Sequence, residues 1–414
     1  MDLAEVRGNC QPAPQEPIWV LFVSHDTGMW GAQRTLLTLL SGINRRQYSP
    51  LLIVPYEGLM SRMAAEFGIP VFVKQLVHWV PGSFVKSRRQ CIRHLYRFFL
   101  TLHQRCRALE RLIVDHEIDL VYTNTVTCVE GAIAARRAGI PHVWHIHEPI
   151  TRNSELSPLL PYWCYLAAIK FLSRSVIFPS RALAQDYPRL VRKASIVYNG
   201  LPSTPLRDRF NAQTQVMKDL GIDTGAKIVA VVGGLHERKD HLTFLAAAAK
   251  VAQTVENVVF LIVGSGRESY TNLLRQRIQD LQLDSKVRLL GWWQGDIHDL
   301  LAAIDVLVIS SEQESFGLTA IEALAMETPV VATRCGGPEE ILVDGETGLL
   351  VPVKDPCALA DAIVRLLMGP ELARRMGKKG RIHILECFGL DRYVHGIQRV
   401  IQDAGSMNQK NKLV

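Results

Sequence analysis

Short apolar runs alternate with longer amphipathic segments along the sequence, and the pattern occurs twice. The runs are nearly continuous in Val, Ile and Leu, which is typical of parallel strands covered on both faces. They predict a first series of strands at 18–24, 51–54, 71–73, 119–123, 142–147, 175–179 and 196–198. A second series is predicted at 227–233, 258–264, 287–291, 306–310, 329–333 and 348–351. Because helical segments separate most of these strands, the sequence indicates two doubly wound α/β domains.

Local composition places the boundaries of these domains. The first seventeen residues contain three prolines among polar residues and lack the basic and apolar regions of a signal peptide, so a flexible tail is expected there. Two prolines with mixed charges mark the best linker. The expected units are a tail at 1–17, an N-terminal domain at 18–200, a linker at 201–224, a C-terminal domain at 225–385, and a final helix with a tail at 386–414.

Composition excludes several classes of protein. The chain has 414 residues, of which 48% are hydrophobic and 21% are charged, as expected for globular domains with sizeable cores. No apolar run approaches the ~18–20 residues that cross a bilayer. The 8 cysteines are scattered without a Cys-x-x-Cys pair. This spacing argues against a zinc ribbon or a thioredoxin-like site and favours a reduced, cytoplasmic setting.

Positive charge is confined to the first half of the chain. The formal net charge is +7 overall, but residues 1–200 carry +9 and residues 201–414 carry −2. The segment 88–111 holds seven arginines against one acid, with apolar residues at helical spacing. This basic amphipathic helix either packs its apolar face on a sheet or contacts an anionic membrane surface. Nucleic acid is the other class of anionic partner that the charge would suit, but no nucleic-acid motif or stacking pattern supports it.

The loops that follow strands are the expected ligand sites, because ligands of open α/β sheets bind beyond the carboxyl ends of the strands. These loops are predicted at 25–31, 147–151, 233–240, 264–269, 291–296 and 311–316. Gly31 would let the backbone approach a ligand at the start of a helix. Arg238 and Lys239 lie where an anion could bind, although the same residues would also suit a solvated turn.

Three closely spaced histidines, His142, His145 and His147, raise the question of a metal site. No acidic or thiol set accompanies them, and on a strand His142 points away from the other two, so no metal is expected. We expect His147 and Glu148, at the end of the strand, to line a cleft.

Two glutamates, Glu314 and Glu322, carry the most specific chemical signal in the sequence. The first lies in the turn after an apolar strand, and the second lies about two turns along the helix-like run 317–327. Between them are the unpaired N–H groups of a helix start, where the helix dipole favours an anion. A phosphate with a sugar on one side and a ribose on the other would fit this layout.

Taken together, these loops resemble the retaining glycosyltransferases of family four, which have the GT-B fold. The resemblance runs from about Ile18 to the C-terminal region. Its specific part is the Glu314–Glu322 segment, continued by Val-Val-Ala-Thr333, by Gly336-Gly337 and by the segment 344–352. Weaker similarities are Gly31-Ala-Gln-Arg34, His147-Glu-Pro149, Tyr198-Asn-Gly200, Lys239-Asp240 and Gly264-Ser-Gly266.

The resemblance implies two Rossmann-like domains facing across a cleft, with a nucleotide-sugar donor held mainly by the second domain and without a metal or cofactor. It also implies a final helix, at 388–402, that crosses back to the first domain. By this resemblance, Glu314 would bind hydroxyls of the donor sugar and Glu322 would bind hydroxyls of the ribose. The backbone at Phe316, Gly317 and Leu318 would contact the sugar and the diphosphate. Lys239 would stabilise the charge on the leaving diphosphate, Gly31 would let the phosphate approach, and His147 would line the reacting centre. One departure concerns Gly234, where the family often has an arginine; either Arg238 takes its place or the diphosphate meets one fewer cation.

The function implied by this resemblance is transfer of a sugar, with retained anomeric configuration, to a lipid-linked, polysaccharide or other glycan acceptor. The expected location is the cytoplasm, including the cytoplasmic face of the membrane. Two other functions stay open. A sugar-nucleotide 2-epimerase also uses two such domains, and the basic first half would suit a non-catalytic binding protein.

Overall fold

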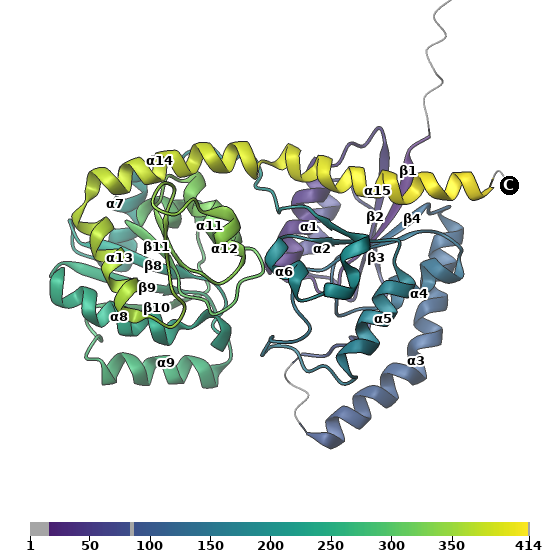
Figure 1. Ribbon diagram of the computed structural model, residues 1–414, viewed down its shortest axis with the longest axis horizontal. Coiled ribbons are helices and arrows are strands. Elements are labelled where there is room, and N and C mark those ends of the chain that lie inside the picture. Colours follow the sequence, from purple (N-terminus) through teal and green to yellow (C-terminus); the bar gives the residue numbers. More distant parts are fainter. Residues whose placement is uncertain (1–15, 83–86, 413–414) are drawn as a thin grey trace, which may run out of the picture.

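The computed structural model describes residues 16–82 and 87–412, which form two lobes that lie side by side (Figure 1). Each lobe is built on one parallel β-sheet, with seven strands in the N-terminal lobe and six in the C-terminal lobe. The expected fold class is thereby confirmed. The expected tail at 1–17 lies outside the described residues except for its last two positions.

The strands follow the two predicted series. In the N-terminal lobe they are β1 (Ile18–Val23), β2 (Tyr48–Val54), β3 (Val71–Val73), β4 (Leu120–Thr123), β5 (His142–His145), β6 (Ser175–Phe178) and β7 (Ala194–Ile196). In the C-terminal lobe they are β8 (Lys227–Val232), β9 (Val258–Val263), β10 (Val287–Gly291), β11 (Val306–Ile309), β12 (Val330–Thr333) and β13 (Leu349–Val351).

Helices connect nearly all of these strands. Those of the first half are α1 (Gly31–Gly42), α2 (Leu59–Glu66), α3 (Arg88–Asp115), α4 (Glu130–Arg137), α5 (Tyr162–Leu172), α6 (Arg181–Gln185) and the 3₁₀ helix η1 (Pro188–Lys193). Those of the second half are α7 (Arg209–Leu220), η2 (Glu237–Lys239), α8 (His241–Thr254), α9 (Glu268–Asp280), α10 (Ile297–Ala303), α11 (Leu318–Ala325), α12 (Gly337–Ile341), α13 (Pro356–Met368), α14 (Pro370–Cys387) and α15 (Leu390–Lys412).

The order of strands creates a switch point in each sheet. The orders are β3-β2-β1-β4-β5-β6-β7 and β10-β9-β8-β11-β12-β13, and every neighbouring pair is parallel. The direction of winding therefore reverses between β1 and β4 and between β8 and β11. Loops leave the carboxyl ends of these strands in opposite directions, which opens a crevice for a ligand.

Most strand boundaries lie within one residue of the prediction; larger differences occur at β5, which ends at His145 instead of 147, and at β2 and β7. Strand β2 begins at Tyr48 instead of 51, because pairing with β1 extends the strand through a polar stretch that contains Pro50. Strand β7 ends at Ile196, where the prediction began, since its ladder with β6 stops at the Phe178–Ile196 pair. In both cases the neighbouring strand, not the local apolar pattern, sets the boundary.

The C-terminal helix α15 belongs to the core of the N-terminal lobe. Figure 1 shows α14 and α15 as one band that runs along both lobes. Tyr393, Val394 and Ile397 are buried in the same hydrophobic cluster as Leu36 and Leu40 of α1. The end of the chain therefore ties the two lobes together by apolar packing.

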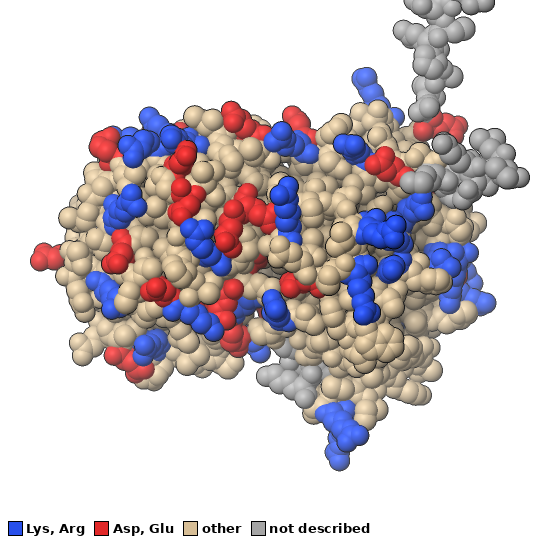
Figure 2. Space-filling model, in the orientation of Figure 1, with Lys and Arg blue, Asp and Glu red and all other residues tan. Residues whose placement is uncertain are grey.

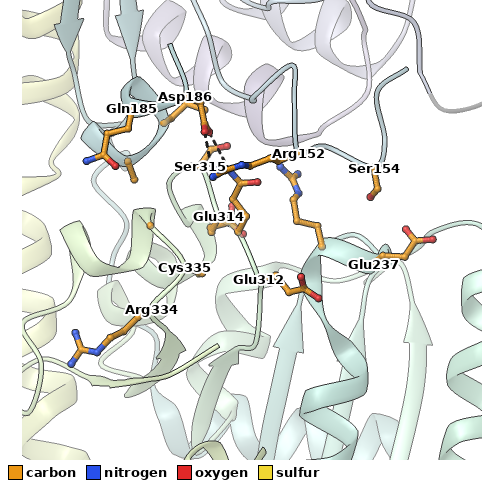
Figure 3. Close-up of a pocket in the computed structure, with 15 residues that line it drawn as sticks. Arg152, Ser154, Gln185, Asp186, Glu237, Glu312, Glu314, Ser315, Arg334 and Cys335 are labelled. Atoms are coloured by element: carbon orange, nitrogen blue, oxygen red, sulfur yellow. Dashed lines mark hydrogen bonds and ion pairs between the residues drawn. The ribbon is translucent and has the colours of Figure 1, made fainter. Parts of the chain in front are cut away.

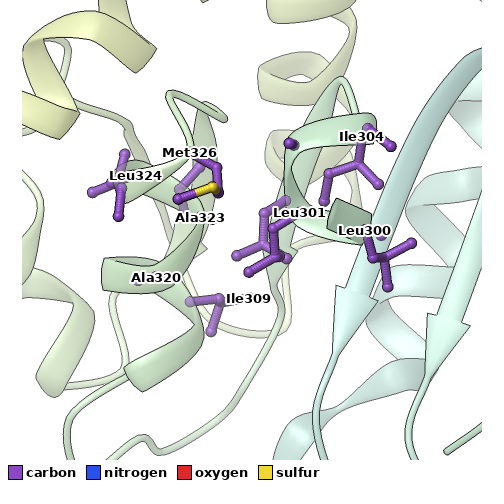
Figure 4. Close-up of a cluster of buried hydrophobic side chains, with 14 of the residues drawn as sticks. Leu300, Leu301, Ile304, Ile309, Ala320, Ala323, Leu324 and Met326 are labelled. Carbon is purple, nitrogen blue, oxygen red and sulfur yellow. The ribbon is translucent and has the colours of Figure 1, made fainter. Parts of the chain in front are cut away.

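Helix α11 is held by a tightly packed core in the C-terminal lobe. Figure 4 shows Leu300 and Leu301 of α10 next to Ala320, Ala323 and Leu324 of α11. The small alanines let the two helices approach closely, and burial of the leucines anchors them. The position of α11, and of any side chain at its start, is thus set by the core.

Helix α3 differs along its length. In its second half, Arg105 is buried and its Nε bonds Glu130 at 2.8 Å, and Cys106, Leu109 and Ile113 pack into the lobe. Its first turns project from the lobe (Figure 1), and Lys and Arg side chains predominate over this lobe on the face shown in Figure 2. The packed interpretation thus holds for the second half and for Phe98, whereas Ile92, Tyr96 and Phe99 of the first half are exposed. Among the helices of the described residues, none has the length and apolar character to cross a bilayer.

Substitution of Gly377 by alanine tests how closely α14 packs on the end of α11. A Cβ at this position would overlap the backbone carbonyl of Glu327, which has no freedom to move aside. We expect Gly377→Ala to lower the free energy of unfolding by about 1–3 kcal/mol, measured by urea denaturation.

Gly405→Ala is the matched control, because a Cβ there meets no atom within 4 Å and the residue also lies in a helix of this C-terminal band. Alanine is the better helix former, so this variant should keep or slightly raise stability. Equal stability of the two variants would show that the α14–α11 approach is not as close as described.

Candidate functional site

One cleft of about 1060 Å³ between the lobes is lined by all nine predicted site residues and by Glu148. Each of the six loops predicted to carry ligand contacts contributes at least one lining residue. The nine predicted site residues in its walls are Gly31, His147, Arg238, Lys239, Glu314, Phe316, Gly317, Leu318 and Glu322.

Glu314 lies in the loop after β11, where backbone bonds fix its position. Its N–H donates to the carbonyl of Cys335 and its own carbonyl accepts from the N–H of Gly337, both at 2.9 Å. The carboxylate forms an ion pair with Lys239. Burial by itself would raise the pKa of Glu314, but the charges of Lys239 and Arg238 outweigh it and hold the pKa below its ordinary value. The Glu314 side chain is therefore an anion that can accept hydrogen bonds.

A sharp turn separates Glu314 from helix α11. Gly317 has φ of +111°, a conformation that favours glycine, and the residues at the start of α11, Leu318 and Thr319, line the cleft. Gly337 packs so closely on the backbone of Phe316 that a Cβ would overlap it. The Gly336-Gly337 pair thus serves the geometry of this turn, and the turn places a helix N-terminus next to Glu314.

Glu322 reaches the cleft from α11 and meets the opposite lobe there. Its side chain is only 2% exposed, and one carboxylate oxygen is bound by the guanidinium of Arg34 from α1. The other oxygen, Oε2, is buried and has no hydrogen-bond partner among the described residues. A buried, unpaired carboxylate oxygen is costly, so this atom marks a position where a ligand donor would be stabilising.

Arg238 places a second cation beside Lys239. Its Nη2 lies 3.7 Å from Glu155 of the N-terminal lobe, while its Nε and Nη1 are buried without a partner among the described residues. His236 also approaches Glu155, at 3.5 Å. Burial, with the nearby Arg238, lowers the pKa of His236 to about 3, so this contact is not an ion pair at neutral pH. The guanidinium of Arg238 therefore has donors available for an anion.

His147 is held in place by the loop after β4. Its Nε2 lies 2.9 Å from Oδ1 of Asn124, and the Nδ2 of Asn124 donates to the carbonyl of Ala32 at 2.8 Å. Asn124 thus connects His147 to the first turn of α1. Burial, together with His25, lowers the pKa of His147 to about 3, so the ring is neutral at physiological pH.

Close backbone contact explains the glycines after β8 and β9. A Cβ on Gly264 would overlap the carbonyl of Gly233, and a Cβ on Gly266 would overlap that of Leu235. The Gly264-Ser-Gly266 sequence therefore packs one loop of the cleft against another. The partner of each glycine thus lies in the loop after β8.

A second cavity, of about 800 Å³, adjoins the cleft behind Glu314. Figure 3 shows Glu312, Glu314 and Ser315 facing Asp186 and Arg152 of the N-terminal lobe. The Nε2 of Gln313 donates to Asp186 at 3.1 Å, which adds a bond between the lobes. Cations and acids are mixed along its walls, so the cavity has no single charge preference.

Three residues of the site were not predicted as such. Arg34 lies one turn after Gly31 on the same face of a helix, a signal that could have found it. Asn124 follows a strand, and the rule that selected the other loops also covers this one. Glu155 lies in the irregular segment between β5 and α5, where no sequence pattern indicates that it would meet Arg238. Within the described part of the chain, no group of three or more His, Cys, Asp or Glu residues could hold a metal ion.

Comparisons with known families match both lobes. The family described as glycosyl transferases group 1 matches residues 212–383, and the family described as glycosyltransferase family 4 matches residues 30–204. The two matches divide the chain at the boundary between the lobes and include every predicted site residue.

Individual relatives match parts of the chain. N-acetyl-alpha-D-glucosaminyl L-malate synthase of Bacillus anthracis is 33% identical over 200 residues, which are 48% of this chain and 51% of the relative. The chain thus spans about half the length of that relative. The UDP-Gal:alpha-D-GlcNAc-diphosphoundecaprenol alpha-1,3-galactosyltransferase of Escherichia coli is 27% identical over 307 residues, which cover 72% of this chain and 78% of the relative.

Among solved structures, HepE of Anabaena in complex with UDP and glucose superposes with a TM-score of 0.74. The superposition covers 92% of this chain and 99% of HepE, at 22% sequence identity. At this level of identity the likeness establishes a shared fold, and it agrees with the two parallel sheets described above.

The neutral state of His147 can be tested by an NMR titration. Because the pKa is lowered to about 3, the ring should stay uncharged from about pH 8 to pH 5, and its Cε1–H resonance, assigned by its loss in His147→Gln, should not move. The unfolded chain binds this proton near pH 6.5, so the stabilisation from the neutral ring is complete above that pH and is lost as the pH falls towards 3. Free imidazole in the sample is the control, and a His147 midpoint near pH 6.5 would contradict the buried environment.

Proposed function

The chain belongs to the glycosyl transferases group 1 of glycosyltransferase family four, and on this premise we propose that it transfers a sugar from a nucleotide-sugar donor to a glycan or lipid-linked acceptor, with retained anomeric configuration. One observation carries the proposal. Glu314 and Glu322 both reach the interlobe cleft on either side of the N-terminus of α11. That arrangement suits a ligand with hydroxyls at both ends and negative charge between them.

In the proposed orientation, the sugar of the donor lies at Glu314 and its ribose lies at Glu322. Glu314 accepts hydrogen bonds from the sugar hydroxyls, and the unpaired Oε2 of Glu322 accepts from a ribose hydroxyl. The diphosphate between them meets the N–H groups at the start of α11, with Gly31 allowing close approach from the other lobe. A Cβ on Gly31 would already contact Leu318 at 3.5 Å, so little space remains for a larger residue.

Positive charge for the leaving diphosphate comes from Lys239 and Arg238. Both line the cleft, and Arg238 has two buried nitrogens without a partner among the described residues. We assign to Arg238 the cationic role of the arginine that the family often has where this chain has Gly234. These charges stabilise the developing oxyanion, and the proposal includes no metal or other cofactor.

The transfer step exchanges one C–O bond for another. The bond from the sugar C1 to the phosphate oxygen breaks, and a bond from C1 to the acceptor oxygen forms on the same face of the sugar. The acceptor hydroxyl loses its proton to the departing phosphate oxygen, so no protein base is needed. His147 is neutral and close to the first turn of α1, which suits a role in lining the reacting centre.

The names of relatives support a carbohydrate or lipid-linked acceptor. The Escherichia coli relative is named for transfer to a GlcNAc unit on diphosphoundecaprenol, and HepE was solved with UDP and glucose. Nothing in the site favours the epimerase alternative over transfer. The two are separated by incubating the donor alone, since only an epimerase would convert it to an isomeric nucleotide sugar.

Replacement of the two glutamates tests the proposed donor site. We expect Glu314→Gln and Glu322→Ala to stay folded and to lose at least about tenfold in transfer rate, since each removes a charged hydrogen-bond acceptor worth roughly 1.5–3 kcal/mol. The measurement is the initial rate of nucleotide release with the nucleotide sugar that most raises the melting temperature of the wild type.

Glu312→Gln is the matched control for Glu314→Gln. Glu312 lies two residues before Glu314, is exposed, and pairs with Lys354 at 3.1 Å. The Glu312→Gln variant should therefore keep the wild-type rate. Full activity of both site variants would mean that the donor is held elsewhere.

We further propose that the first half of α3 contacts an anionic membrane surface. Ile92, Tyr96 and Phe99 are each more than half exposed there. Arg89 and Arg93 are exposed on the same turns. Exposed aromatic and aliphatic side chains interleaved with arginines suit the headgroup region of a bilayer with negative charge.

Binding to vesicles tests this contact. We expect wild-type protein to co-sediment with phosphatidylglycerol vesicles, and the change of Arg89, Arg93 and Arg97 to alanine to weaken binding by roughly 1 kcal/mol for each arginine. The matched control removes the same charge from α14, by changing the exposed Arg375, Lys378 and Lys379 to alanine, and should bind as the wild type does. Equal binding to phosphatidylcholine vesicles would contradict the electrostatic account.

A further inference from the structure

The part of the cleft formed by the N-terminal lobe contains polar groups that have no role in the proposed binding of the donor. We define the acceptor wall as the five residues His25, Asp26, Gln33, His78 and Thr127, all of which line the cleft from this lobe. They come from the loop after β1, the first turn of α1, the segment after β3 and the loop after β4. Lys239 and Glu314 line the same cleft from the C-terminal lobe.

Gln33 is the main reason to expect a ligand at this wall. Its residue surface is only 1% exposed, yet neither its amide nitrogen nor its amide oxygen has a hydrogen-bond partner among the described residues. Proteins rarely leave both ends of a buried amide unpaired, because each unmade bond costs free energy. Since Gln33 lines the cleft, a bound molecule is the available source of both partners.

His25 adds a second unpaired group. Its Nδ1 is buried without a partner among the described residues, and burial, with His78, lowers the pKa of the ring to about 3. A neutral imidazole offers one hydrogen bond at each nitrogen and does not attract an anion. The neighbouring Asp26 is already engaged, because its Oδ1 accepts from the hydroxyl of Tyr56 at 2.6 Å and from the N–H of Gly28 at 2.9 Å.

The charges on this side of the cleft disfavour an anionic ligand. Among the described residues that line the cleft from the N-terminal lobe, Arg34 is the single Lys or Arg, and its guanidinium is bound to Glu322. The same side carries the carboxylates of Asp26 and Glu155, whereas burial raises the pKa of Glu148. Side chains that recognise a phosphate or carboxylate are usually charged or present several donors, which the five side chains of this wall do not.

We propose that the acceptor wall binds the acceptor through an uncharged saccharide unit, whose hydroxyls bond the amide of Gln33 and the Nδ1 of His25. An amide that both donates and accepts matches a hydroxyl, which does the same. That this wall receives the acceptor rests on the proposed function. The inference adds that the sugar at the reacting end of the acceptor is neutral.

Binding of matched neutral and charged sugars tests the inference. The probes are the methyl glycosides of glucose, galactose and N-acetylglucosamine, compared with glucose 6-phosphate, galactose 6-phosphate and glucuronate, by saturation-transfer NMR. We expect signal from at least one neutral sugar and at least tenfold weaker signal from each charged one. Preference for a charged sugar, or contact with none of the six, would overturn the inference.

Variants separate the wall from the rest of the site. Gln33→Ala and His25→Ala should each weaken binding of the neutral sugar about tenfold, as expected for one or two lost hydrogen bonds. Gln398→Ala is the matched control, since this glutamine on α15 also has a buried, unpaired Nε2 but lies outside the cleft. Unchanged binding in both wall variants would overturn the inference even if the neutral sugars bind.

The same samples distinguish this inference from the proposed function. Stabilisation of the wild type by a panel of nucleotide sugars, measured by thermal shift, reports on the donor half of the cleft only. Gln33→Ala should keep this stabilisation. If no nucleotide sugar stabilises the wild type while neutral sugars still bind, the proposed donor function fails and the wall remains a saccharide site.

Discussion

The apolar packing of α15 on α1 is the interaction on which the arrangement of the cleft depends. Helix α1 carries Gly31, Gln33 and Arg34 in its first turn, and all three line the cleft. Because the end of the chain returns from the C-terminal lobe to bury Tyr393 and Ile397 against this helix, the two halves of the site are held by the hydrophobic effect at a distance from the polar groups. The cleft itself can then remain polar.

The polar atoms of the cleft are of two kinds, those held in ion pairs and those without a partner among the described residues. Glu314 is compensated by Lys239, and one oxygen of Glu322 by Arg34. Oε2 of Glu322, two nitrogens of Arg238 and the amide of Gln33 have no hydrogen-bond partner among the described residues, and they are distributed over both walls. The cations Lys239 and Arg238 hold the pKa of Glu314 below its ordinary value, while the atoms without partners are available to bind a ligand.

The sequence predicted most of the fold because each buried parallel strand is marked by a local apolar run. All thirteen strands were expected close to their positions, since a strand buried on both faces needs a continuous apolar run. The limits of β2 and β7 were not predicted, because pairing with a neighbouring strand sets them. The tight contacts of the glycines after β9 with the loop after β8 join segments about thirty residues apart, so no local pattern indicated them.

By itself, the sequence determined the two-domain α/β class and the set of loops that meet at the cleft, since both follow from apolar periodicity and from the position of loops after strands. Only the tertiary structure decided which groups meet across the cleft. The pairing of Arg34 with Glu322 joins residues 288 positions apart, and Glu155 reaches Arg238 from an irregular segment. Such contacts depend on the relative placement of two separately folded cores, and no local pattern of residues specifies that placement.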